Sequence, residues 1–273
     1  MKNKLKPIAI LSLIFVVLIT VTTVIIYSQS SSSLALPVKQ QGDEVNVPVA
    51  SLNELLPDNP KEKVKREKKN KKRNLKFASE GQGDSKRFML TDKSQSSYGS
   101  FSSHDPAEPA IPAKQSDAVI IAEVKDAKAY LTEDKTSIYS EFTVNAIDIL
   151  KNTTAEEINF GNLVTVSRGG GALRFPSGKT IVNLFDGKPM PRIGRKYIFF
   201  LKYDNEVNDF SIITAYEVKQ EQIIPLDGLQ QNGTVVQQLA AQQSYSGSSE
   251  LDFVSQVREA IANNSDVFQG RGQ

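Results

Sequence analysis

The sequence predicts a mostly β fold, an antiparallel sandwich or a small barrel, that follows a membrane-spanning segment and a long tether. Three observations lead to this prediction. Short runs rich in β-branched and aromatic residues recur through residues 116–228, turn signals separate them, and no helical pattern lies between them. A stretch of about 110 residues is long enough to form one hydrophobic core.

The chain begins with a segment that fits a membrane. Lys2, Lys4 and Lys6 precede an uncharged apolar run over 8–27. About 20 such residues cross a hydrocarbon core of ~30 Å as a helix. Because the positive flank stays in the cytoplasm, residues 1–27 are predicted to anchor the chain in the cell membrane by a single pass. The rest of the chain would then be extracytoplasmic.

Cleavage of this segment is the alternative. Ser33 and Ala35 have the −3 and −1 spacing that a signal peptidase accepts, although the apolar run is longer than the ~7–15 residues of most cleaved signals. Cleavage would make the protein secreted. The chain has no cysteine, which excludes the bacterial lipid-anchored form, since that form needs one, and also a disulfide framework. The folded part must therefore depend on its apolar core.

Residues 28–115 are predicted to be a disordered tether, because they are rich in polar residues and have few apolar clusters. Within them, residues 61–76 hold ten Lys or Arg against two Glu. The cations expected to contact an anionic surface are Lys61, Lys63, Lys65, Arg66, Lys68, Lys69, Lys71, Lys72, Arg73 and Lys76.

Several interpretations of this basic block stay open. It can bind the head groups of anionic lipids, at ~1 kcal/mol per basic residue, or an anionic polymer of the cell envelope. Nucleic acid is disfavoured because only Phe77, at its edge, offers a ring for base stacking. The block can also be a solvated spacer that repels itself.

The strands of the domain are predicted in order along the chain. Over 138–150 the residues alternate, so that Phe142, Val144 and Ala146 share one face, and the apolar phase then shifts, which indicates a bulge near Ala146. A Pro-Ser-Gly-Lys turn at 176–179 joins two short strands. The other predicted strands are 118–124, 163–167, 196–202, 210–218 and 222–224. The core candidates are Phe142, Val144, Tyr197, Phe199 and Leu201.

The order of these motifs resembles an uncharacterised group of exported or membrane-anchored bacterial β-domain proteins. That pattern runs A-D-x-V-V-x-G-x-V, V-L-K-G, a Gly-Gly turn, R-F-P-S-G-K and G-x-x-Y-hydrophobic-F-L. Its matches here are Ser116–Val124, Glu141–Asn152, Gly169–Gly171, Arg174–Lys179 and Gly194–Leu201. Ser116, Ala122 and Asn152 depart from the pattern, and nothing after Asp227 belongs to it. The resemblance implies a small OB-like barrel of the netrin or inhibitor type, and it implies no activity.

The tail is predicted to contain a linker over 229–248 and an amphipathic helix over 249–264. Ser249 is a candidate N-cap, with Asp252 three residues on. The apolar stripe of this helix is expected to pack on the barrel, and docking into the groove of a protein partner is the alternative.

No motif predicts a catalytic residue, a metal site or a cofactor. Gly171–Thr180 is close to a phosphate loop, but six residues separate its glycines and a strand follows in place of a helix. His104 is the only histidine and, without cysteines, cannot supply a zinc site. The acidic run Asp204–Asp209 lacks the glycine and terminal glutamate of a calcium loop, which favours a charged hairpin turn.

The hairpin region is the candidate ligand site of the domain. Its residues are Arg168, Gly169, Gly170, Gly171, Arg174 and Lys179. Residues 116–228 carry 13 Lys or Arg and 16 Asp or Glu, so a cationic patch there would attract an anionic ligand to a mildly acidic domain. The plainer interpretation is that these charges only solvate a turn.

Two function classes follow. The first is a membrane-tethered extracytoplasmic module, non-enzymatic, that binds an unidentified ligand or has a structural role. The alternative is an exported hydrolase-like enzyme whose site combines carboxylates with Arg168, Arg174 or Lys179.

Overall fold

The computed structural model describes residues 48–51, 60–80, 90–99, 105–132, 134–230 and 232–269. These residues are mostly β, with an antiparallel sheet, as the sequence predicted. The predicted membrane segment, residues 1–27, lies outside them. In the part of the chain that is described, no helix is both long and apolar enough to cross a membrane.

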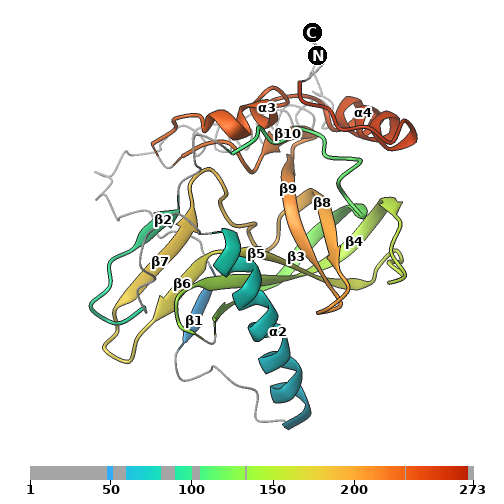
Figure 1. The fold of residues 1–273 in the computed structure, drawn as a ribbon. Coiled ribbons are helices and arrows are strands. Elements are labelled where there is room, and N and C mark those ends of the chain that lie inside the picture. Colours follow the sequence, from blue (N-terminus) through green and yellow to red (C-terminus); the bar gives the residue numbers. More distant parts are fainter. Residues whose placement is uncertain are drawn as a thin grey trace, which may run out of the picture. The chain divides into compact units, whose positions relative to one another are not determined.

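Six strands form the main sheet (Figure 1). They are β3 (Ala118–Leu131), β4 (Ile138–Asn152), β5 (Leu163–Gly169), β8 (Lys196–Asp204), β9 (Asp209–Lys219) and β10 (Gln222–Pro225). β4 pairs antiparallel with β3 and β5, β5 pairs parallel with β9, and β9 pairs antiparallel with β8, which pairs antiparallel with β3. The pairings of these five strands therefore form a closed circuit. β10 pairs antiparallel with the end of β9.

The long hairpin of β3 and β4 has the bulge that the sequence predicted. Ile121 pairs with Asp148 and Ala122 with Ala146, so Ile147 is the extra residue. Before this bulge, Phe142, Val144 and Ala146 all point into the core and are fully buried. The extra residue at the bulge therefore explains why the apolar phase shifts in the sequence after Ala146.

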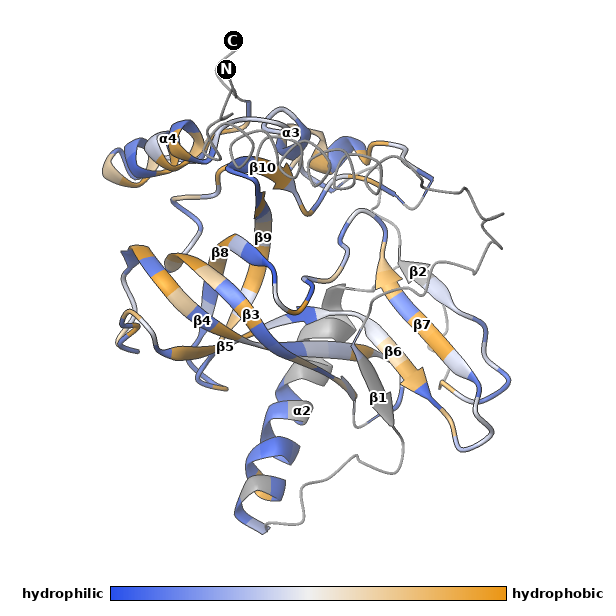
Figure 2. Cartoon of the chain, turned by 180° about the vertical axis from the view of Figure 1, so that it is seen from behind, coloured by the Kyte–Doolittle hydropathy of each residue, from blue (hydrophilic) through white to orange (hydrophobic). Residues whose placement is uncertain are grey.

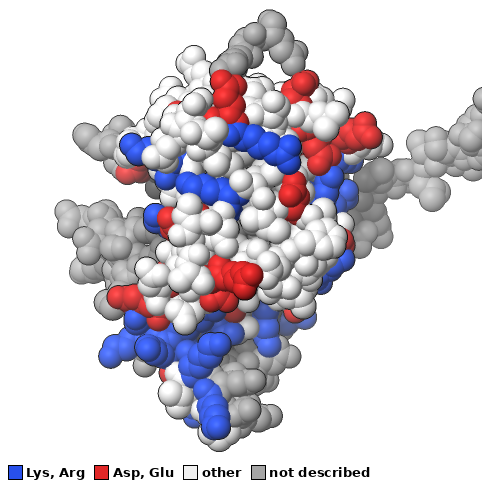
Figure 3. Space-filling model, turned by 90° about the vertical axis from the view of Figure 1, so that its right-hand side faces the viewer, with Lys and Arg blue, Asp and Glu red and all other residues white. Residues whose placement is uncertain are grey.

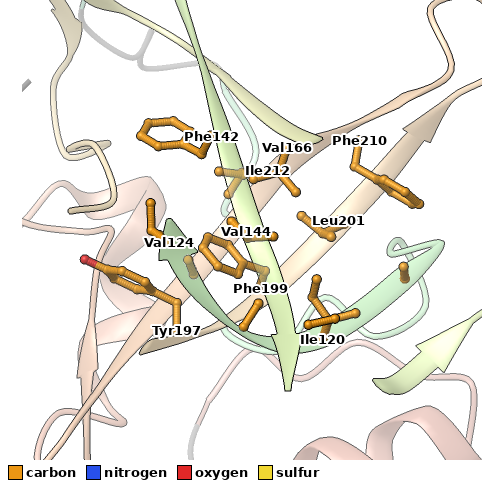
Figure 4. Close-up of a cluster of buried hydrophobic side chains, with 14 of the residues drawn as sticks. Ile120, Val124, Phe142, Val144, Val166, Tyr197, Phe199, Leu201, Phe210 and Ile212 are labelled. Carbon is orange, nitrogen blue, oxygen red and sulfur yellow. The ribbon is translucent and has the colours of Figure 1, made fainter. Parts of the chain in front are cut away.

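The main core lies within the circuit of strands. The five predicted core residues are fully buried in one cluster, with Phe142 and Val144 on β4 and with Tyr197, Phe199 and Leu201 on β8. Figure 4 shows these side chains lying together with Val166 and Phe210 from β5 and β9. Alternate residues of neighbouring strands meet there because the side-chain period of a strand is two.

A second core covers the opposite face of β8. Ile198 and Phe200 pack there against the helix α4 (Glu250–Ala262), whose Phe253 and Val257 are fully buried. The apolar stripe of α4 thus packs on the domain, as first expected. Ser249 caps the helix, its Oγ accepting a hydrogen bond from the backbone of Asp252 at 3.1 Å.

This second core also takes in residues beyond the predicted limits of 116–228. Ala110, Ile111 and Ala113 are fully buried on one side of that range, and Tyr245 is buried on the other. The predicted linker over 229–248 holds two short helical segments, η2 (Gln237–Leu239) and α3 (Ala240–Gln243). Side chains from both flanks are needed because the outer faces of β3, β8 and β9 are themselves apolar.

A four-stranded sheet packs on the far end of the β3–β4 hairpin. Its strands are β1 (Val49–Ser51), β6 (Gly171–Arg174), β7 (Thr180–Phe185) and β2 (Ser97–Gly99), in the order β1-β6-β7-β2. β6 and β7 form the predicted hairpin, with Gly178 at φ +84° in its turn. Because β7 is a strand, the phosphate-loop interpretation is excluded here, as expected.

The predicted tether is wrong for the described residues of its range. Pro60–Glu80 form the helix α2, and β1 and β2 flank it. The tether was predicted because this segment is polar and has few apolar clusters. Lys, Arg and Glu are nevertheless good helix formers, and proline is favoured at the first helical position.

Truncation of a core phenylalanine tests the main core. Phe142→Ala should lower the free energy of unfolding of the full chain by about 3–5 kcal/mol, because it leaves a cavity among fully buried side chains. Phe160→Ala is the matched control, since Phe160 is 78% exposed, and should change it by about 0.5 kcal/mol or less. Urea denaturation followed by circular dichroism measures both, and equal effects would contradict the assignment of this core.

Candidate functional site

Helix α2 presents cations to the outer face of the main sheet. Arg66, Lys69 and Lys72 recur every three residues, which places them on one side of the helix. All three form ion pairs with acidic residues of the domain. These three cations therefore hold part of the basic block against the folded domain.

The surface that receives these cations comprises Tyr130, Tyr139, Glu141 and Asp209, and we call it the acidic–aromatic site. Strand register brings it together. Tyr130 on β3 lies opposite Tyr139 on β4, and Glu141 follows on the same face.

The register also brings Asp209 close to Glu141. Glu141 lies beside Ser167 on β5, and Ser167 lies beside Ser211 on β9. Asp209 is two residues before Ser211 and therefore shares its face. The inward residues between them, such as Phe142 and Phe210, are buried in the main core, so the carboxylates are on the outer face.

Arg66 makes the most elaborate contact of the site. Its Nη1 lies 2.7 Å from Glu141 Oε1 and donates a longer hydrogen bond, 3.4 Å, to the hydroxyl of Tyr139. Its Nη2 donates to the hydroxyl of Tyr130 at 3.1 Å, and its Cζ lies 3.9 Å from the centre of that ring. The rings of Tyr130 and Tyr139 stack at 5.4 Å. The guanidinium thus has a carboxylate, two hydroxyls and an aromatic face as partners.

Lys69 joins the two carboxylates. Its Nζ lies 2.9 Å from Glu141 Oε1 and 2.6 Å from Asp209 Oδ2. One turn further along α2, Lys72 Nζ lies 2.6 Å from Glu206 Oε2, in the turn between β8 and β9. The acidic run Asp204–Asp209 is therefore a charged hairpin turn, as predicted, and it also supplies partners for α2.

The carboxylates of these pairs are more deeply buried than those of surface ion pairs. Glu141 is 8% exposed and Asp209 is 3% exposed. Burial by itself raises the pKa of Glu141, but Lys69 and Arg66 outweigh it and hold that pKa below its usual value. Burial likewise lowers the pKa of Arg66, and the hydrogen bond and charge of Glu141 reverse this and raise it. Each carboxylate would be costly to bury without these cations.

Five other lysines of α2 are exposed. These are Lys61, Lys63, Lys65, Lys68 and Lys71. Figure 3 shows Lys and Arg gathered over α2, at the lower end of the face drawn, whereas charges of both signs alternate over the rest of that face. Of the ten predicted surface cations, Arg66, Lys69 and Lys72 point to the domain instead. The side chains of Arg73 and Lys76 lie outside the described residues.

The predicted ligand patch at the hairpin is not assembled as expected. Arg168 is only 5% exposed, and Asp227, its partner, is fully buried. The guanidinium binds both oxygens of this carboxylate, at 2.6 and 2.9 Å, and the carbonyl oxygen of Pro189 at 2.8 Å. The sequence cannot show this pairing, because 59 residues separate the two.

The other patch residues divide between packing and surface roles. Gly169, Gly170 and Gly171 are buried, and a Cβ on Gly170 would lie 2.7 Å from Met190 Cε at φ +103°. These glycines serve close packing in place of ligand contact. Arg174 and Lys179 are exposed, and Lys179 Nζ donates to the carbonyl oxygens of Asp92 and Ser94 at 2.7 and 2.8 Å.

Comparison with known proteins identified no relative of this chain. No protein-family model matches the chain, and no curated protein matches it in sequence. Within the described ranges, no group of three or more His, Asp or Glu side chains is arranged to hold a metal ion. The site must therefore be interpreted from its own chemistry, which is the recognition of a guanidinium and an ammonium group by buried carboxylates and tyrosines.

The pair of Arg168 and Asp227 is expected to be structural. Arg168→Gln should destabilise the full chain by about 3–5 kcal/mol, because it leaves the buried Asp227 carboxylate without its cation. Arg258→Gln is the control, since Arg258 forms an exposed pair with Asp148 and should contribute less than about 1 kcal/mol. Thermal unfolding compares the stability of the two variants. An effect of Arg168→Gln as small as that of Arg258→Gln would contradict a structural role for the buried pair.

The docking of α2 should depend on pH through Glu141. Because the pKa of Glu141 is lowered when α2 is docked, its contribution is complete above its ordinary pKa of 4.5 and is lost as the pH falls through the lowered value. Hydrogen exchange of the α2 amides, corrected for intrinsic rates and followed from about pH 6 to about pH 3, should show protection lost at the acid end. Glu141→Gln should weaken both the docking and this pH dependence. Protection in α2 that persists until β8 itself unfolds would contradict the prediction.

Proposed function

We propose that this chain is a membrane-tethered, extracytoplasmic, non-enzymatic binding module, in which a small OB-like barrel holds the basic helix α2 against anionic lipid head groups. The closed circuit of strand pairings, with β5 parallel to β9 as its one parallel junction, supports the barrel. The apolar run over 8–27 with its lysine flank supports a single-pass anchor whose N-terminus is cytoplasmic.

One observation carries the proposal, which is the division of charge on α2. Arg66, Lys69 and Lys72 fix the inner side of the helix to the domain. Five other lysines of the helix are exposed to solvent. Each basic residue near an anionic membrane contributes ~1 kcal/mol, so five of them give an appreciable, salt-dependent affinity.

The position of α2 in the chain also suits a membrane surface. The 32 residues between Tyr27 and Pro60 can span at most about 110 Å, so an anchored chain keeps α2 within that distance of the bilayer. The anchor would raise the local concentration of lipid around the helix, which makes a modest intrinsic affinity sufficient. Binding to an anionic polymer of the envelope uses the same lysines and is separated from lipid binding by the experiment below.

The described residues give no specific support to the hydrolase alternative. Arg168, one of the three cations that it invoked, is buried against Asp227. A protein partner for α4 stays a prediction. The stripe of that helix is covered by the domain, and Leu251, at 83% exposed, is its main apolar side chain at the surface.

A label on α2 tests the proposal, and the absence of cysteine makes such labelling specific. The full chain with Val64→Cys, a position that is 65% exposed on α2, would carry a donor dye and be reconstituted into vesicles with an acceptor on the head groups. With about one third anionic phosphatidylglycerol, energy transfer should rise above that in neutral vesicles and fall again at high salt. Leu251→Cys, on α4, is the control and should show no such dependence.

Two variants and one competitor complete the design. Lys63→Gln with Lys71→Gln should reduce the effect of anionic lipid on the α2 label, and the chain should stay in the vesicles after an alkaline carbonate wash. Equal energy transfer in neutral and anionic vesicles would contradict lipid binding, and release by carbonate would contradict the anchor. Binding of soluble polyphosphate by a chain that ignores anionic vesicles would favour the envelope polymer instead.

A further inference from the structure

The two longer helices of the described chain contact the sheet in opposite ways. α4 buries an apolar stripe formed by Phe253, Val254, Val257 and Ala260. The described contacts of α2 run through the charged ends of Arg66, Lys69 and Lys72, while Val64 is exposed. In Figure 2 the described residues of α2 are mostly hydrophilic, whereas α4 carries both hydrophobic and hydrophilic residues.

This difference decides how permanent each contact is. Apolar burial is lost entirely when α4 leaves, and nothing in water replaces it. When an ion pair separates, water hydrates both charges. The net contribution of the pair to docking is therefore small compared with its Coulomb attraction. The α2 contact is therefore the one that another cation-bearing helix can replace.

The flanks of α2 are fixed independently of its contact with the domain. Before it, β1 pairs with β6. After it, Leu90 donates a backbone hydrogen bond to Lys135 at 2.8 Å, Lys179 binds the carbonyls of Asp92 and Ser94, and β2 pairs with β7. α2 can therefore leave the sheet while both flanks stay, and a tether of this kind keeps it at an effective concentration on the order of mM.

The acidic–aromatic site also has a defined specificity. A guanidinium satisfies the Tyr130 ring and the two hydroxyls, because it is planar and holds its donors in a fixed fork, whereas an ammonium is a compact charge without a planar face. An ammonium fits between Glu141 and Asp209, both of which lie within 2.9 Å of Lys69 Nζ. The required spacing is that of residues 66 and 69, one helical turn apart.

We infer that the acidic–aromatic site is a binding site for a partner's basic helix with Arg and Lys at positions i and i+3, and that α2 is its tethered, displaceable ligand. In the closed chain α2 occupies the site and lowers the apparent affinity for a partner. A partner with the same cation pair displaces α2 and leaves the helix held by its two flanks. The inference does not depend on whether the exposed lysines of α2 bind lipid.

The experiment compares three forms of the full chain. They are wild type, Arg66→Gln with Lys69→Gln, and Lys63→Gln with Lys71→Gln. The two double variants have equal net charge, but only the first removes the cations that occupy the site. The probe is a dye-labelled synthetic peptide with the sequence of residues 60–80, and its binding is measured by fluorescence anisotropy.

We expect the Arg66→Gln, Lys69→Gln chain to bind the peptide about tenfold or more tightly than either other form, because its own helix no longer competes. A peptide with the same two replacements should not bind it. Glu141→Gln added to that chain should abolish binding of the unmodified peptide, whereas Arg66→Lys alone should give an intermediate gain, since the charge remains and the planar fork is lost.

Every other result contradicts the inference. Equal affinity for all three chains would show that α2 does not occlude the site, and binding that survives Glu141→Gln would place it elsewhere. Absence of binding to the Arg66→Gln, Lys69→Gln chain would show that the site recognises no free helix. Failure of that chain and of Arg66→Lys to fold, judged by circular dichroism, would make α2 a permanent part of the structure.

Discussion

The burial of both faces of β8 is the constraint on which the fold depends. Tyr197, Phe199 and Leu201 need an apolar environment on one side of the strand, and Ile198 and Phe200 need one on the other. The circuit of strands provides the first, and α4 with the segment before β3 provides the second. Without disulfides, these two cores supply the apolar burial that a chain of this size needs to offset its conformational entropy.

The strands could be predicted from the sequence because their signals are local. The bulge at Ile147 and the turn at Gly178 each follow from residues within one element and its neighbours. The closure of the second core across Ile111 and Phe253 could not be predicted, because those residues lie about 140 apart in the chain and meet only in the fold. The limits of the domain were therefore drawn too narrowly.

The candidate site was missed for the same reason. Glu141 alternates with the predicted core residues of β4, and the sequence offers no sign that a cation 75 residues earlier covers it. Arg168 was misjudged in the opposite direction, because its neighbouring glycines suggested an open turn, whereas they allow close packing around a buried ion pair. In both cases long-range charge pairing decides whether a charged side chain is exposed, and a single sequence contains little information on such pairing.

The basic block shows why net charge is a poor guide to what a polar segment does. Residues 61–76 carry a charge of +8 and the domain over 116–228 carries −3, and opposite charge alone would favour any loose association of the two. The structure instead directs part of this charge to two nearly buried carboxylates and two tyrosines, which confers geometry as well as attraction. Five further lysines of the same helix are exposed. The described contacts of α2 with the domain are made by charged side chains with carboxylates and tyrosines, whereas the two cores are built from apolar side chains of the strands and α4. Charge and geometry therefore place the basic helix, and apolar burial holds the domain beneath it together.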